Sequence, residues 1–395
     1  MMGLGYIGLP TAALIASRGI QVQGIDVNQS VVDTINSGKI HIVEPALDGL
    51  VKHVVEKGLL KADITPNNAD VFLIAVPTPF KGDHEPDLKF VESATRMIIP
   101  KLKEGNLFIL ESTSPVGTTD KMAKIIFDER PELKGKINIA YCPERVLPGN
   151  VIYELEHNDR VIGGLDEEST KASQNFYRHF VKGELHATNA KTAEMCKLVE
   201  NSSRDVSIAF ANELSMICDK AEINIWELIH LANKHPRVNI LQPGTGVGGH
   251  CIAVDPWFIV SEFKKEAVII RNAREINNYK TEWVIEKIRS TALQFELDND
   301  RKATIALMGL AFKPDIDDLR ESPALLVADT LLLDGKFDLL LVEPNLEDNL
   351  KYDLTDYKEM NGRADIVAYL VAHKEFRVLE TEVIELDFCG IKQRG

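Results

Sequence analysis

The hydrophobic and polar positions of this chain alternate between short apolar runs and helix-length amphipathic segments. Runs such as DVFLIAV at 70–76 are long enough for one buried strand each, and the alternation restarts near residue 304. This pattern predicts an α/β fold with two doubly wound parallel sheets, each covered by helices on both faces. The expected strands are 21–27, 70–76, 107–112, 137–142, 304–308, 338–342, 365–371 and 385–388, and the expected helices 11–18, 87–102, 267–290 and 322–333.

One long helix is expected between the two sheets, because residues 191–221 contain neither proline nor glycine. A polar stripe along it is either a solvated face or a functional surface on which Lys197 and Asn201 lie one turn apart. A helix of this length also suits the core of a homodimer. The apolar stripe consists of Met195, Leu198, Val199, Val206, Phe210, Leu214 and Ile217, and the polar stripe of Glu194, Lys197, Asn201, Asp205 and Asn212.

The first ten residues, MMGLGYIGLP, place Gly3, Gly5 and Gly8 in a GxGxxG pattern ahead of an expected helix. In a Rossmann-like βαβ unit such glycines let a pyrophosphate approach a helix N-terminus, and an acid about 20 residues on binds the adenosine ribose. Asp26 ends the next expected strand and favours NAD over NADP. A glycine-rich turn without a ligand is the alternative, but helix, strand and acid are in register. The residues expected to contact NAD here are Gly3, Gly5, Tyr6, Ile7, Gly8 and Asp26.

The strand that normally leads into such a fingerprint is nearly missing, since only Met1 and Met2 precede Gly3. That strand is central in a doubly wound sheet, so its loss is expected to destabilise the fold and weaken cofactor binding. We hypothesise a truncated coding sequence.

Polar segments follow three of the expected strands, where parallel sheets place their ligands. Their hydroxyl groups are suited to hydrogen bonds with cofactor or substrate, and the carboxyl group is suited to act as an acid or base. Helix caps and turns use the same residue types, which is the structural alternative. The candidates are Val76, Thr78, Ser112, Thr113, Glu144 and Arg145.

A dense glycine segment, GTGVGGHCIAVDP at 244–256, combines four glycines with Cys251, His250 and Asp255. Glycines permit close approach of a ligand to the main chain, and a cysteine at the end of such a loop is placed like a nucleophile. A buried packing thiol is the equal alternative, because free cysteine is among the most buried residue types. The loop by itself does not separate the two.

The net charge of −15 argues against a nucleic-acid or membrane-surface partner and leaves anion binding to local cationic clusters. Arg237 and Asn239 lie in one such segment, and Lys313 and Arg320 follow the first strand of the second sheet. Five cysteines without metal-type spacing predict no metal site and a reducing compartment, the cytoplasm. We find no run of about 18 apolar residues that suggests a membrane span.

Seven motifs in order resemble the UDP-glucose/GDP-mannose dehydrogenase family over essentially the whole chain. They are GLGYIGLP, VPTP, STSPVG, CPERVLPG, EMCKLVENS, GGHCIAVDP and FKPDIDDLRESP. The resemblance implies an NAD-binding Rossmann-like domain at 1–190, a central helical, dimerisation and catalytic-loop region at 191–298, and a C-terminal nucleotide-sugar-binding α/β domain at 299–395.

The resemblance further implies a four-electron oxidation of a sugar C6 alcohol to a carboxylate, with two NAD and one water, through a cysteine thiohemiacetal and thioester. By position it assigns catalysis to Cys251, Lys197, Asn201, Asp255, Glu144 and Thr113. It assigns cofactor contacts to Val76, Thr78, Ser112, Thr113 and Arg320 as well as the fingerprint. It assigns substrate contacts to Glu144, Arg145, Lys197, Asn201, Arg237, Asn239, Gly246, Gly249, Phe312 and Lys313.

The sugar expected from the resemblance is an N-acetylhexosamine carried on UDP. UDP-glucose dehydrogenases have a second glutamate four positions after the first, where this chain has Pro148. Other stretches, such as HPRVNILQPG, are similar to members that oxidise UDP-N-acetyl-D-mannosamine for surface-polysaccharide synthesis. UDP-N-acetyl-D-glucosamine is the nearest alternative. A two-electron hydroxyacid dehydrogenase would have no use for Cys251, and an inactive nucleotide-binding protein is the rival from another class.

Overall fold

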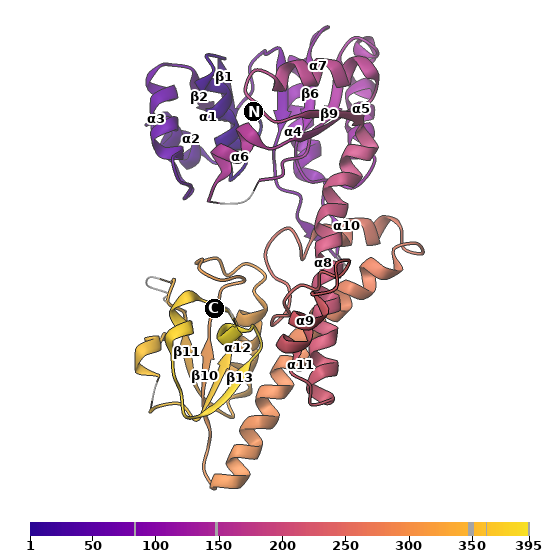
Figure 1. The fold of residues 1–395 in the computed structure, drawn as a ribbon. Helices are drawn as coiled ribbons and strands as arrows, with labels where there is room; N and C mark the ends of the chain where they lie inside the picture. Colours follow the sequence, from indigo (N-terminus) through magenta and orange to yellow (C-terminus); the bar gives the residue numbers. More distant parts are fainter. Residues whose placement is uncertain (83, 147–148, 347–350, 361, 394–395) are drawn as a thin grey trace. The chain divides into compact units, whose positions relative to one another are not determined.

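The computed structural model describes residues 1–82, 84–146, 149–346, 351–360 and 362–393, which form two compact units. Unit 1 comprises Met1–Glu200 and unit 2 comprises Asn201–Gly395. The boundary lies within α8 (Ala190–Lys220), the long helix expected from the sequence (Figure 1). The predicted division into three domains stays a prediction.

Among the described residues, the main sheet of unit 1 is built from seven strands in two hydrogen-bonded groups, and β4 (Phe80–Lys81) and β5 (Glu85–Pro86) form a separate antiparallel pair. One group has the order β1-β2 and the other β3-β6-β7-β8-β9. The strands pair in parallel except β7 with β8, which are antiparallel, so the expectation of a wholly parallel sheet is wrong at this edge. The strands are β1 (Val22–Ile25), β2 (Leu60–Asp63), β3 (Val71–Ile74), β6 (Leu107–Leu110), β7 (Asn138–Tyr141), β8 (Arg160–Gly164) and β9 (Leu185–Asn189).

Met2 joins the two groups of strands. It forms parallel bridges with Ile25 on one side and Ile74 on the other. Its amide donates to the Leu73 carbonyl at 2.8 Å, and its carbonyl accepts from the Ala75 amide at 2.8 Å. The position of a first strand is therefore held by a single bridging residue. The α-amino group of Met1 is buried beside it and donates to the Gln23 carbonyl at 2.9 Å; burial lowers its pKa to about 6.

Two apolar cores cover the two faces of this sheet, because successive strand residues point to opposite sides. On β6, Leu107 and Ile109 enter the core beneath α1 (Gly8–Ser17), whereas Phe108 and Leu110 enter the core beneath α4 (Lys89–Ile98). The first core also takes α2 (Gln29–Asn36), α3 (Leu47–Glu56), α6 (Val151–His157) and α7 (Glu167–Tyr177), and the second takes α5 (Thr118–Glu129).

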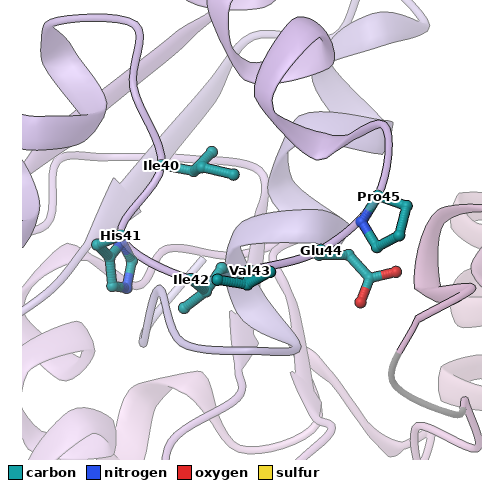
Figure 2. Close-up of a pocket in the computed structure, with 6 residues that line it drawn as sticks. All are labelled: Ile40, His41, Ile42, Val43, Glu44 and Pro45. Carbon is teal, nitrogen blue, oxygen red and sulfur yellow. The ribbon is translucent and has the colours of Figure 1, made fainter. Parts of the chain in front are cut away.

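A loop at 40–45 borders a surface hollow of about 560 Å³ (Figure 2). Its carboxylate, Glu44, is buried and points toward the start of α6. The two carboxylate oxygens accept from the amides of Gly149 and Val151 at 2.9 and 2.8 Å. Glu44 therefore satisfies the Val151 amide, which the first turn of α6 leaves without a partner, and the Gly149 amide just before the helix, which is a structural role.

Unit 2 contains a four-stranded parallel sheet with the order β11-β10-β12-β13. Alternate residues of β10 again enter two cores, Ile305 with Leu307 and Ala306 with Met308. The strands are β10 (Thr304–Met308), β11 (Asp338–Val342), β12 (Ile366–Tyr369) and β13 (Ile384–Asp387); the helices are α9 (Ile225–Ala232), α10 (Asp255–Glu262), α11 (Val268–Asn299) and α12 (Pro323–Asp334).

The predicted fold class is confirmed: two α/β sheets are joined in sequence by a long helix. The expected strands at 304–308 and 338–342 match β10 and β11 residue for residue. Sequence patterning did not reveal β2, β8 or β9. These strands carry polar or glycine positions, as in LKAD, RVIGG and LHATN, and therefore lack the continuous apolar run of a central strand. In the part of the chain that the structure describes, no helix combines the length and apolarity needed to cross a bilayer.

Candidate functional site

The three fingerprint glycines of unit 1 serve three different purposes. Gly3 has φ +86° and lies so close to the Ala75 carbonyl that a Cβ would sit 2.5 Å from its oxygen. At Gly8 a Cβ would lie 1.9 Å from the Gly3 oxygen, so the helix start packs directly on the turn. Nothing lies within 4 Å of a Cβ placed on Gly5, which leaves that backbone open to a ligand.

Asp26 lies directly beside this turn. Its carboxylate accepts from the Leu4 amide at 3.1 Å and from the Asn28 amide at 2.9 Å, and the side chain is half-buried. Because a carboxylate offers about four acceptor positions, two remain for ribose hydroxyls. The open Gly5 backbone, the start of α1 and Asp26 together fit the pyrophosphate and ribose of NAD.

Predicted strand-end residues join two loops, at 76–78 and 112–113, through side-chain hydrogen bonds. The Ser112 hydroxyl accepts from the Val76 amide at 2.9 Å and donates to the Val76 carbonyl at 2.7 Å. The Thr78 hydroxyl donates to the Thr113 carbonyl at 2.7 Å. The Ser112 and Thr78 side chains are buried, and their hydroxyl groups hold the two loops together. The Thr113 side chain is half-buried.

Glu144 follows β7 and binds Arg160, a residue that no motif in the sequence had indicated. One carboxylate oxygen accepts from the Arg160 guanidinium at 2.9 Å, and the other accepts from the Arg145 amide at 2.6 Å. The Glu144 and Arg160 side chains are only 8% and 4% exposed, so this ion pair is largely removed from bulk solvent. Pro148, the position that replaces the second family glutamate, lies outside the described residues.

Arg145 is committed to an ion pair within unit 1. Its Nη2 and Nε lie 2.8 and 3.1 Å from the two carboxylate oxygens of Glu200 on α8. A bidentate carboxylate already neutralises this guanidinium. The remaining nitrogen, Nη1, donates to the Asp159 carbonyl at 3.4 Å, so the predicted contact of Arg145 with substrate requires exchange of one of these partners.

The polar stripe of α8 is divided between structural and candidate catalytic residues. Glu194 accepts from the amides of Gly117 and Thr119 and from the Thr119 hydroxyl, at the start of α5. Asp205 is buried against Arg274 of α11, with 2.7 Å between carboxylate oxygen and guanidinium. Asn212 accepts from the Gly244 amide at 2.9 Å. The half-buried Lys197 and Asn201 are the remaining two members.

Asn201 and Asp255 form a direct pair in unit 2. The Asn201 amide nitrogen lies 2.5 Å from a carboxylate oxygen of Asp255, whose side chain is buried at the first residue of α10. The Cys251 carbonyl accepts from the Asp255 amide at 2.8 Å, which closes the turn between the cysteine and α10. The predicted association of Asn201, Asp255 and the cysteine loop is thus present within this unit.

Cys251 is exposed, which excludes the packing-thiol alternative for this residue. Of the other four cysteines, Cys142, Cys218 and Cys389 are buried and Cys196 is half-buried. Access to solvent is a requirement for a nucleophilic thiol, and Cys251 meets it.

The glycines of the cysteine loop have a packing reason that the sequence did not suggest. A Cβ on Gly246 would lie 2.4 Å from the Thr281 hydroxyl, and one on Gly248 would lie 2.5 Å from the Glu321 carbonyl oxygen. Gly249 has φ +81°, and its Cβ would lie 2.8 Å from the Phe312 ring. The space on the Cβ side of these glycines is therefore occupied by the protein itself. Predicted contacts of Gly246 and Gly249 with the sugar stay predictions and would involve the backbone.

In unit 2, the turn that follows β10 is bound by a carboxylate of the same unit, Glu343. The Glu343 carboxylate accepts from the amides of Leu310 and Ala311 at 2.7 and 2.9 Å and pairs with His373 Nε2 at 3.1 Å. Burial opposes the charge, but His373 and these two amides hold the pKa of Glu343 below its ordinary value. This turn has no open acid for a ribose, so it does not repeat the NAD fingerprint.

The predicted cationic residues of unit 2 lie on exposed loops. Lys313 is exposed one residue after Phe312, and the Arg320 side chain pairs with Asp318 at 2.7 Å. The Arg320 carbonyl accepts from the Gly249 amide at 3.2 Å and so supports the cysteine loop. Arg237 and Asn239 are exposed in a segment whose end is fixed by two hydrogen bonds between Asn233 and Ile240.

Comparison with known proteins matches three family models in order along the chain. The descriptions are "UDP-glucose/GDP-mannose dehydrogenase family, NAD binding domain" for residues 1–181, the "central domain" of that family for 191–279 and its "UDP binding domain" for 306–388. The UDP-N-acetyl-D-mannosamine dehydrogenase of Campylobacter jejuni is 55% identical over 98% of this chain and 98% of its own. The enzyme of the same name from Escherichia coli K12 is 54% identical over 98% of this chain and 96% of its own.

A solved structure shows the same fold over nearly the full length. The UDP-N-acetyl-mannosamine dehydrogenase Cap5O from Staphylococcus aureus superposes with a TM-score of 0.86, at 38% identity, over 99% of this chain and 98% of its own.

Proposed function

Because the chain belongs to the UDP-glucose/GDP-mannose dehydrogenase family, we propose that it oxidises the C6 alcohol of UDP-N-acetyl-D-mannosamine to the carboxylate. The product is UDP-N-acetyl-D-mannosaminuronic acid, and the reaction consumes two NAD and one water. The observation that carries the proposal is the exposed Cys251 next to the Asn201–Asp255 pair. A dehydrogenase that stopped at the aldehyde would need no such thiol.

Unit 1 holds NAD through the Gly3–Gly8 turn, with the pyrophosphate over Gly5 and the start of α1 and the adenosine ribose on Asp26. NAD, when bound there, accepts one hydride in each of the two oxidation steps. Asp26 selects NAD because a 2′-phosphate would meet the negative charge of its carboxylate.

Cys251 makes the second oxidation possible. An aldehyde carbon is planar and has no tetrahedral carbon from which hydride leaves. The Cys251 sulfur forms a bond to that carbon, and the former carbonyl oxygen takes up a proton, so a thiohemiacetal with one C–H bond results. Oxidation of that carbon gives a thioester. Water then adds its oxygen to the thioester carbon, the C–S bond breaks, and the sulfur leaves as thiolate.

Lys197 and Asn201 are proposed to stabilise the oxyanions that develop on the substrate oxygen in these steps. Both groups donate hydrogen bonds, and they lie one helical turn apart on α8. The Asn201 amide is oriented by Asp255, since the 2.5 Å bond fixes its nitrogen toward the carboxylate. Asp255 in turn is proposed to accept protons released at the thiol or at the attacking water.

Glu144 and Thr113 are proposed to act on the water that opens the thioester. Glu144 keeps free acceptor positions although two are taken by Arg160 and the Arg145 amide. Thr113 offers a hydroxyl at the neighbouring strand end, in the loop that Thr78 fixes.

Further nucleotide-sugar contacts are proposed for residues of unit 2, by position in the family pattern. Phe312 and Lys313 follow the closed turn of the second sheet and suit a uracil or ribose face and a phosphate, respectively. Arg237 and Asn239 add a guanidinium and an amide on an exposed loop. Arg320 is proposed to contact NAD through its guanidinium, which also forms an ion pair with Asp318.

We propose a homodimer formed through α8. Three large apolar residues of this helix are 41–54% exposed: Val199, Phe210 and Ile217. Their spacing of 11 and 7 residues keeps them on one helical face, as a helix–helix seam requires. We expect Phe210→Glu to convert a dimer into a monomer in light scattering, and an unchanged mass would contradict this interface. A reducing compartment, the cytoplasm, suits an enzyme with an exposed nucleophilic thiol.

The decisive experiment counts NADH against sugar consumed over a panel of UDP-sugars. Two NADH per UDP-N-acetyl-D-mannosamine, with slower turnover of UDP-N-acetyl-D-glucosamine, is the expected result. One NADH per sugar would reject the thioester route. Cys251→Ser is expected to abolish acid formation and leave at most single-hydride chemistry. Cys196→Ser, at the half-buried thiol, is the matched control and is expected to retain the full NADH yield.

A further inference from the structure

A buried arginine in unit 1 contacts the carboxylate to which the proposed function assigns thioester hydrolysis. Arg160 is the first residue of β8, the strand that runs antiparallel to β7. Its Nη2 donates to Glu144 at 2.9 Å and to the Leu155 carbonyl at 3.3 Å. Its guanidinium lies over the Tyr177 ring, 5.0 Å from the centroid. The Tyr177 ring, the Glu144 carboxylate and the Leu155 carbonyl thus fix the position of the Arg160 guanidinium.

The Glu144 carboxylate is fixed at both oxygens. The Arg145 amide binds Oε1 and the Arg160 guanidinium binds Oε2, so the carboxylate plane cannot rotate without breaking one of the two bonds. Two hydrogen bonds leave acceptor positions for a water molecule. At the position of the second family glutamate this chain has Pro148, which leaves the orientation of the water to Glu144.

A second carboxylate competes for the same guanidinium. Glu111, at the end of β6, accepts from the Tyr177 hydroxyl at 2.5 Å, and within the described residues its other oxygen has no hydrogen-bond partner. Burial raises the pKa of Glu111 to about 7, against the opposing effect of Arg160. Cys142 and the Met1 amino group are the other titratable groups that face this cluster, and burial raises the pKa of Cys142 to about 12.

The charge balance of the cluster therefore favours the Arg160–Glu144 pair. Burial alone would disfavour the guanidinium charge, but Glu144 and its neighbours more than offset that effect and raise the pKa of Arg160. Tyr177 satisfies one oxygen of Glu111 and presents its ring to Arg160, which keeps the guanidinium directed at Glu144.

We propose that Arg160 is a positioning residue for thioester hydrolysis, because it fixes the Glu144 carboxylate that orients the attacking water. This inference rests on the proposed function. In the step concerned, Glu144 takes a proton from water, the water oxygen bonds to the thioester carbon, the C–S bond breaks, and the sulfur leaves with the electron pair as the Cys251 thiolate. The Arg160 side chain is only 4% exposed, and its proposed action is entirely through Glu144.

The test is a double-mutant cycle of Arg160→Gln and Glu144→Gln in the full-length protein. Each single variant is expected to lower kcat about 10- to 100-fold. KM for UDP-N-acetyl-D-mannosamine should fall in parallel, so kcat/KM should change less than about threefold, because the steps before the thioester are unaffected. Because hydrolysis becomes rate-limiting, both variants should release roughly two NADH per site in a burst and carry a thioester on Cys251 in intact-mass spectra. In the double variant the second substitution should lower kcat no further.

Controls separate this inference from the proposed function and from misfolding. Arg96→Gln removes a surface ion pair with Glu129 of the same unit and is expected to leave kcat unchanged. Arg160→Lys keeps the charge and should recover part of the rate; if Arg160→Gln does not fold, Arg160→Lys and Glu144→Gln carry the test.

Three outcomes would overturn the inference: losses that multiply in the double variant, a normal rate without burst in Arg160→Lys and Arg160→Gln, or wild-type behaviour of Glu144→Gln. Absence of NADH from the wild-type protein would instead reject the proposed function.

Discussion

The two sheets of this protein use an acid at the same topological position in opposite ways. Asp26 follows the strand beside the first turn of unit 1, and Glu343 follows the corresponding strand of unit 2. Asp26 is half-buried and accepts from one turn amide, whereas Glu343 is buried and accepts from two turn amides and from His373. An acid that completes its own turn has little capacity left for a ligand. The same backbone plan therefore gives an open nucleotide turn in one unit and a structural turn in the other.

The largest difference between the two acids should be in stability. Glu343→Ala leaves the buried amides of Leu310 and Ala311 without an acceptor, so we expect the free energy of unfolding to fall by about 3 kcal/mol. Asp26→Ala, at the half-buried counterpart, should cost about 1 kcal/mol or less. Denaturant titration with probes in each unit measures both. Equal losses in the free energy of unfolding would show that Asp26 and Glu343 stabilise their turns to the same extent, against this comparison.

The glycines of the open turn should separate folding from cofactor binding. Gly3→Ala forces a Cβ against the Ala75 carbonyl at a left-handed φ, and we expect a loss of about 2 kcal/mol in stability. Gly5→Ala meets no protein atom within 4 Å, so stability should change by less than about 0.5 kcal/mol while NAD affinity falls more than about tenfold. Calorimetric NAD titration and thermal unfolding of the two variants provide the comparison. Normal NAD binding by Gly5→Ala would place the pyrophosphate elsewhere.

Cofactor choice should depend on Asp26 and not on Glu343. Asp26→Asn removes the negative charge and is expected to weaken NAD binding about tenfold while weakening NADP binding less, because the repulsion of a 2′-phosphate is gone. KM values for the two cofactors measure the change. Glu343→Gln, in protein that remains folded, should leave their ratio as it is. A shift in that ratio would mean that unit 2 takes part in cofactor recognition.

The pH dependence of stability should differ in sign between two buried acids. Because the pKa of Glu111 is raised, its contribution to the free energy of unfolding is fully present below pH 4.5 and is lost as pH rises toward 7. Because the pKa of Glu343 is lowered, its contribution is present above pH 4.5 and is lost on acidification. Burial lowers the pKa of the Met1 amino group to about 6, so its contribution to stability is present above pH 8 and is lost as pH falls toward 6.

Glu111→Gln isolates the first effect. It should remove a decline on the order of 1 kcal/mol between pH 5 and 7 in unfolding curves of unit 1. An unchanged slope in this variant would contradict the assignment. Glu132→Gln, an exposed acid of the same unit, serves as control.

The glycine turn and the strand-end loops of the site were predictable from local sequence, because their residue types and spacing are typical of such turns and loops. The Gly3, Gly5 and Gly8 pattern predicted a turn that the structure shows in detail, and strand ends predicted that the loops at 76–78 and 112–113 meet. Cys251 could not be separated from a packing thiol until its exposure was known. Arg160 could not be selected from the sequence, since a lone arginine at the start of a strand forms no recognisable motif.

The sequence by itself determined the central strands of both sheets, the long helix between them, the NAD fingerprint and the family motifs, because these depend on periodicity and on residues close along the chain. Tertiary structure decided the use of side chains. It divided the α8 stripe between Glu194, Asp205 and Asn212, which bind other elements, and Asn201, which pairs with Asp255. It also showed that Glu343 closes its turn while Asp26 leaves its turn open. Partners distant in sequence meet only after folding, so no local pattern contains them.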